Sequence, residues 1–111
     1  MTSEKLTLEH LASHGPLPEI LQAEWSQDQV LQLFADLSLG AQVHHVQLKS
    51  AKTDASVSLA DATAAFLAGA ANAIQVRYVF ESEGWCDTIL PGDPTTKIIR
   101  SRLPDQPSER T

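Results

Sequence analysis

The sequence predicts an α+β fold in which a three- to four-stranded, mainly antiparallel sheet packs with two principal helices. Two observations predict it. Apolar side chains recur at helical spacing in two capped segments of the first two-thirds of the chain, and they alternate with polar side chains between turns in the last third. Helices followed by a C-terminal β-meander are typical of a sheet that is covered by helices on one face.

The clearest helix spans residues 27–39. Ser26 and Gln29 have the spacing of a capping box, and Gly40 is a typical stop signal. The apolar residues of this segment recur at helical spacing and share one face: Val30, Leu33, Phe34 and Leu37. Together these signals predict an amphipathic helix.

The middle of the chain predicts a strand, a loop and a second helix. Residues 41–49 favour an extended strand, and residues 50–56 are small and polar, as in a loop. Ser58 caps the second helix, with Asp61 three residues later, and Asn72 ends it. One side of this helix consists mostly of small residues, which we interpret as packing against the sheet.

The last third of the chain predicts the β-meander. Residues 74–81 alternate with a period of two, residues 85–90 form the return strand, and residues 95–103 form the third strand. The first hairpin turn has Gly84 where a left-handed residue is wanted, and residues 91–94 form the second turn.

The two ends of the chain are expected to be less regular. Short helices are predicted over residues 7–14 and 19–24. The tail, residues 104–111, is rich in Pro, Ser and charge and is predicted to be flexible. A length of 111 residues predicts a single α+β domain over residues 1–103.

Charge and cysteine content argue against several classes of partner. The net charge of -6 opposes binding to nucleic acid or to an anionic membrane, because phosphate contacts need a cationic face. The single cysteine, Cys86, cannot form an internal disulfide, which fits a reducing compartment. Neither a signal peptide nor an apolar run long enough to span a bilayer is visible, so a cytoplasmic location is expected.

The expected hairpin register predicts a binding site. With residues 82–84 as the loop, one side of the sheet collects Arg77, Trp85, Asp87 and Arg100. Asp87 is expected to pair diagonally with both arginines, and Arg100 to stack on the Trp85 indole. An aromatic residue beside arginines is typical of protein interfaces.

The leading hypothesis is therefore a non-enzymatic accessory or adaptor domain that binds another protein, or a second copy of itself. In the competing interpretation, the N-terminal segment covers Trp85.

A second hypothesis is a small enzyme or ligand-binding protein with a pocket between the sheet and the helices. The same register points Cys86 inward, beside Tyr78, as a small hydrophobic residue. His44 or His45 could activate the thiol if their strand lies next to the hairpin.

A third hypothesis is a metal-handling accessory protein. His10 and His14 are four residues apart, which would place both on one helical face. The sequence contains no phosphate loop, dinucleotide fingerprint or nucleophile elbow. We therefore assign no catalytic residue, metal ligand or cofactor from the sequence.

Overall fold

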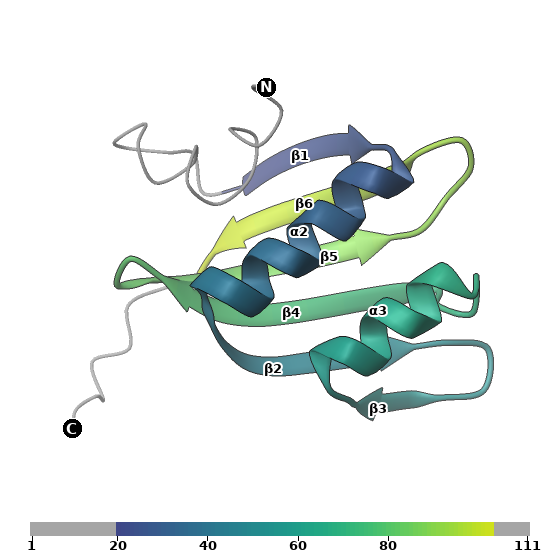
Figure 1. Cartoon of the computed structure of the whole chain (residues 1–111), viewed down its shortest axis with the longest axis horizontal. Helices are drawn as coiled ribbons and strands as arrows, with labels where there is room; N and C mark the ends of the chain where they lie inside the picture. The colour runs from purple at the N-terminus through teal and green to yellow at the C-terminus, as the bar shows by residue number, and fades with distance from the viewer. Residues whose placement is uncertain (1–19, 104–111) are drawn as a thin grey trace.

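The computed structural model describes residues 20–103, which form a six-stranded antiparallel sheet with two helices on one face (Figure 1). The elements are β1 (Ile20–Trp25), α2 (Gln27–Gly40), β2 (Gln42–Lys49), β3 (Asp54–Ser56), α3 (Leu59–Leu67), β4 (Ala73–Phe80), β5 (Glu83–Leu90) and β6 (Thr96–Arg102). The strand order is β1-β6-β5-β4-β2-β3. The predicted α+β class and its two helices are confirmed, but the sheet is larger than the three or four strands expected.

One additional strand is β1, where a short helix was predicted over residues 19–24. Leu21, Ala23 and Trp25 alternate with polar residues, and β1 pairs antiparallel with β6, so that Trp25 lies opposite Thr96. The pattern of period two was present in the sequence, but it covers only one short segment. Its partner strand lies about seventy residues away in the chain, and the pairing with that strand decides the conformation.

The other additional strand is β3, which lies inside the segment predicted as a loop. It pairs with the end of β2, with Ser56 opposite Gln47. The second helix is also shorter than expected, because α3 ends five residues before Asn72. Gly69 has a φ of 71°, and its N–H donates to the Phe66 carbonyl at 3.1 Å, while the next N–H reaches back to Ala65 at 2.9 Å. This is a Schellman motif, which a left-handed glycine closes.

The structure confirms α2 and its capping box. The Gln29 N–H donates to Ser26 Oγ at 3.3 Å, and the Ser26 N–H donates to Gln29 Oε1 at 2.9 Å. The four apolar residues predicted to share one face are all buried: Val30, Leu33, Phe34 and Leu37. They form the core with the covered face of the sheet.

The register of the β4–β5 hairpin differs from the prediction. The turn consists of Glu81 and Ser82, with φ angles of 51° and 69°, and Phe80 lies opposite Glu83. Two consecutive left-handed residues are typical of the two-residue turns whose twist suits a hairpin. The prediction of a loop at residues 82–84 is therefore wrong, and the pairing of β4 with β5 is shifted by three residues from the predicted register.

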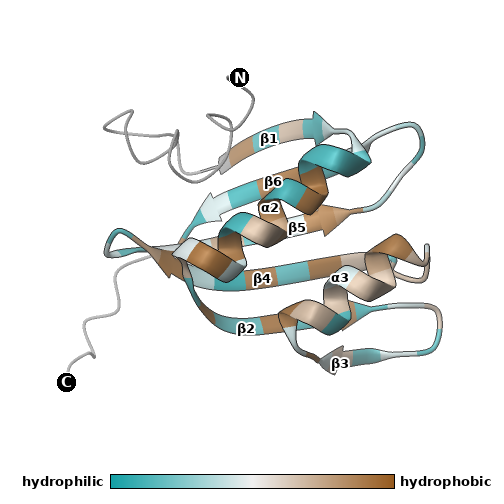
Figure 2. Ribbon diagram, viewed as in Figure 1, coloured by the Kyte–Doolittle hydropathy of each residue, from teal (hydrophilic) through white to brown (hydrophobic). Residues whose placement is uncertain are grey.

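An odd shift moves every side chain of β5 to the other face of the sheet. Tyr78 now lies opposite Trp85, where Thr88 was expected, and Ile74 lies opposite Ile89. Large apolar side chains of both strands are thereby buried beneath the helices, whereas the predicted register would have left Trp85 and Ile89 on the far side. Figure 2 shows the alternation of hydrophobic and hydrophilic residues along β4, as expected for a sheet with one covered and one open face.

Candidate functional site

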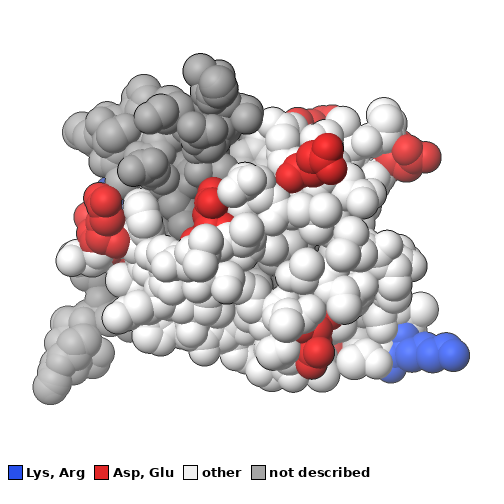
Figure 3. All heavy atoms as spheres, viewed as in Figure 1, with Lys and Arg blue, Asp and Glu red and all other residues white. Residues whose placement is uncertain are grey.

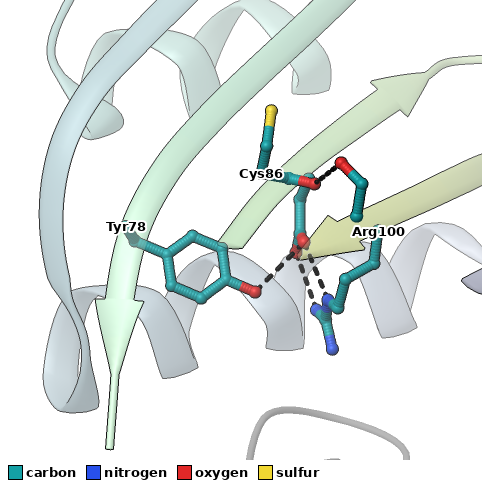
Figure 4. Close-up of polar contacts among 5 residues, drawn as sticks. Tyr78, Cys86 and Arg100 are labelled. Atoms are coloured by element: carbon teal, nitrogen blue, oxygen red, sulfur yellow. Dashed lines mark hydrogen bonds and ion pairs between the residues drawn. The ribbon is translucent and has the colours of Figure 1, made fainter. Parts of the chain in front are cut away.

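Tyr78 and Arg100 point toward the same carboxylate on the covered face of the sheet (Figure 4), and this carboxylate belongs to Asp87. Arg100 donates from Nε to Oδ1 and from Nη2 to Oδ2, each at 2.7 Å, and Tyr78 donates its hydroxyl to Oδ1 at 3.0 Å. Asp87 is entirely buried, and Arg100 is 4% exposed. A buried carboxylate is tolerated only with such charged and hydrogen-bonded partners.

This cluster is not suited to proton transfer near neutral pH. Burial, reinforced by the negative charge of Asp87, raises the pKa of Tyr78 well above its usual range. Burial alone would lower the pKa of Arg100, but the adjacent Asp87 carboxylate outweighs it, so that the pKa is raised. Tyr78 therefore stays neutral and Arg100 stays charged. The cluster joins β4, β5 and β6 beneath the helices, and we interpret it as a structural element.

The structure brings together only part of the predicted binding site. Arg100 pairs with Asp87 as expected, but from the directly opposite position of β6 and not diagonally. Trp85 shares this face and is only 5% exposed, as part of the core. Arg77 lies on the open face, opposite Cys86. The expectation of one exposed patch with all four residues is therefore wrong, because the register shift separates Arg77 from the others. The N-terminal cover proposed for Trp85 lies outside the described residues.

The open face carries a row of side chains that crosses four strands. His45, Arg77, Cys86 and Ser101 occupy directly paired positions in β2, β4, β5 and β6. Cys86 is buried, and burial raises the pKa of its thiol despite the opposing charge of Arg77. A protonated, buried thiol is a poor nucleophile.

The arrangement expected for a small enzyme does not form. Tyr78 lies on the covered face, whereas Cys86 and His45 lie on the open face. His45 also shares a hydrogen bond of 2.8 Å with Gln47 Oε1.

No group of three His, Cys, Asp or Glu side chains that could hold a metal ion occurs within residues 20–103. His10 and His14 lie outside this range. Over the same range, no helix is long and apolar enough to cross a membrane.

The feature that sequence reasoning missed is a groove on the outer surface of the two helices. α2 and α3 lie side by side across the sheet and run in opposite directions (Figure 1). The groove has a volume of about 390 Å³, and its lining is mostly apolar: Leu31, Phe34, Ala35, Ser38, Leu59, Ala60 and Thr63. Phe34 packs against Phe66, with ring centroids 5.9 Å apart. None of the lining side chains titrates, so the groove is suited to contact and not to acid–base chemistry.

Each helix also carries an exposed leucine one helical turn beyond a residue that lines the groove. Leu39 lies four residues after Ala35 on α2 and is 87% exposed. Leu67 lies four residues after Thr63 on α3 and is 53% exposed. The outward positions of α3 are otherwise mostly alanine, at Ala60, Ala64 and Ala68. A helix in water normally has a polar outer face, so an apolar one indicates a contact surface. The sequence did contain this signal, because residues 59–67 are apolar on more than the side that faces the sheet.

The charges on the helix layer all have the same sign. α2 and α3 carry three ionisable side chains, Asp28, Asp36 and Asp61, and neither helix contains Lys or Arg. Figure 3 shows this face largely uncharged, with a few acidic groups scattered over it and a basic side chain at one corner. The groove is therefore an apolar surface on a helix layer whose charged side chains are all acidic.

None of the protein-family models, curated proteins or solved structures with which the chain was compared matches it.

Proposed function

We propose that this chain is a non-enzymatic accessory or adaptor domain that binds another protein through the outer surface of α2 and α3. The observation that carries the proposal is the apolar groove between the helices, on a helix layer that also exposes Leu39 and Leu67. Exposed, contiguous apolar surface on a small protein is typical of an interaction site.

The proposal keeps the binding role predicted from the sequence but moves the contact surface. Trp85 lies beneath the helices and can contact a partner only if they move. The Tyr78–Asp87–Arg100 cluster supports the layer from below, because it joins the three strands on which α2 rests. The partner surface is one layer further out, on the helices themselves.

A photo-cross-linking amino acid tests the surface. We would place it at Ala60, which is exposed in the groove, and at Ser56, which is exposed on β3, and irradiate the full chain in extracts of its own cells. The expected result is a discrete adduct from Ala60 that Leu67→Glu reduces at least tenfold and that Gln75→Glu, on the open face, leaves unchanged. Equal adducts from Ser56, or an adduct that is insensitive to Leu67→Glu, would overturn the proposal.

A further inference from the structure

We infer that the groove between α2 and α3 binds an amphipathic helix whose apolar face is flanked by Lys or Arg. This inference rests on the proposed function and specifies the class of partner. Three properties of the described residues carry it: the main-chain groups the groove can satisfy, the size of its lining residues, and the sign of the surrounding charge.

The groove cannot supply hydrogen-bond partners for the main chain of an extended peptide. A bound strand would bring unpaired N–H and C=O groups, and each needs a hydrogen-bond partner when it is buried. The lining supplies only two hydroxyl groups, and that of Thr63 already donates to the Leu59 carbonyl at 2.9 Å. Thr63 Oγ1 can then only accept a hydrogen bond, and Ser38 supplies the one remaining hydroxyl donor of the lining. A helix satisfies its own main chain and presents only side chains, so it suits an apolar groove between helices.

The small lining residues allow a third helix to approach closely. Ala35 and Ala60 are exposed and face the groove from opposite helices, with Phe34 buried beneath them. Ridges of leucine side chains on a partner helix fit between such small residues. α2 has 14 residues, or about 21 Å at 1.5 Å per residue, which a partner helix of three to four turns would match.

The charges favour a basic partner over a second copy of the chain. Asp28, Asp36 and Asp61 are the only ionisable residues of the two helices, and the whole chain has a net charge of -6. Two copies that meet through this surface would bring carboxylates toward carboxylates. A helix with Lys or Arg beside its apolar face supplies the complementary charge, which increases the association rate and selects the partner.

Synthetic peptides test the inference on the full chain. The probe is an amphipathic peptide of about 18 residues, or five turns, with leucines along one face and lysines on both sides of it. One control has glutamate in place of lysine, and a second has the same composition in a scrambled order. Binding is measured by fluorescence anisotropy at low and at physiological salt. We expect the leucine–lysine peptide to bind at least tenfold more tightly than either control, and less tightly as salt is added.

Variants of the chain locate the site. Ala60→Arg should abolish binding of the leucine–lysine peptide. The double variant Asp28→Lys, Asp61→Lys should instead prefer the leucine–glutamate peptide, and Asp54→Lys, on the open side of β3, should change neither preference. Circular dichroism confirms that each variant is folded. Equal affinity for the lysine and glutamate peptides, or binding that Ala60→Arg leaves intact, would overturn the inference.

Three further outcomes show whether this inference, the proposed function or both are wrong. If no peptide binds but the Ala60 adduct forms and is lost in Leu67→Glu, the surface is correct and the partner class is wrong. If sedimentation shows a dimer that Ala60→Arg dissociates, the occupant is a second copy and the inference fails. If neither the peptide nor the adduct depends on the groove, both proposals fail.

Discussion

Arg100 and Asp87 lie directly opposite each other on β6 and β5 and form a two-pronged ion pair, with both N···O distances at 2.7 Å. The pair is nearly inaccessible to solvent, since Asp87 is entirely buried. Two charges in such a site depend on each other, because neither has water to replace a lost partner.

We therefore expect Asp87→Ala to destabilise the fold by about 3–5 kcal/mol, because it leaves the Arg100 guanidinium buried without a counter-charge. Urea denaturation followed by tryptophan fluorescence measures the change. The double variant Asp87→Leu, Arg100→Met should be more stable than Asp87→Ala, since it removes both charges. A loss below about 1 kcal/mol for Asp87→Ala would contradict the buried pair.

Because the pKa of Tyr78 is raised in the folded chain, we predict that the fold loses stability in alkaline solution. This pKa is raised in the folded chain by burial and by Asp87, whereas in the unfolded chain the hydroxyl ionises near its ordinary value of about 10. Below that pH Tyr78 is neutral in both the folded and the unfolded chain, so its hydroxyl makes its full contribution to stability. Above it the unfolded state binds fewer protons than the folded state, so the free energy of unfolding falls, by up to about 1.4 kcal/mol per pH unit.

The measurement is direct because Tyr78 is the only tyrosine of the chain. We expect the tyrosinate absorbance near 295 nm to rise only together with unfolding, and Tyr78→Phe to remove this component of the pH dependence. Tyr78→Phe should also cost about 1.5–3 kcal/mol at neutral pH, as the loss of a hydrogen bond to a charged group. Ionisation of Tyr78 in the native state at its ordinary pKa would refute the arrangement.

Trp85 should be protected from quenchers in solution. Iodide quenching of the Trp25→Phe variant isolates Trp85, since the chain has two tryptophans. Because Trp85 is 5% exposed, we expect quenching several-fold weaker than in the urea-denatured chain. Ready quenching in a folded monomer would indicate instead the exposed patch that the sequence first suggested.

The hairpin turn provides a test of the register. Replacing Glu81-Ser82 by Asn-Gly should stabilise the fold by about 1 kcal/mol, because these residues adopt the left-handed conformation at lower cost. Gly84→Ala is the matched control. Its new Cβ would lie 3.4 Å from the Leu103 Cβ, an ordinary contact, so the change should stay below about 1 kcal/mol. A large loss in Gly84→Ala with no gain from Asn-Gly would support the turn at residues 82–84.

Local signals in the sequence were sufficient for some elements and insufficient for others. The capping box at Ser26 and the apolar positions that follow it predict α2 because all of its interactions lie within a few residues. The conformation of residues 20–25 depends on pairing with β6, and the alternation in this one short segment is too brief to distinguish a strand from a short helix without that partner. The four predicted site residues were separated for a similar reason, since the position of one turn decides which face each occupies.

The sequence by itself determined the α+β class, α2 with its cap, the strands that form the meander and the acidic, lysine- and arginine-free helices, because composition, periodicity and capping are local properties. The tertiary structure alone decided the six-strand order, the hairpin register, the burial of Trp85 and the groove between α2 and α3. These depend on which distant segments pair, and a shift of three residues in the β4–β5 pairing is enough to move a residue predicted at the surface into the core.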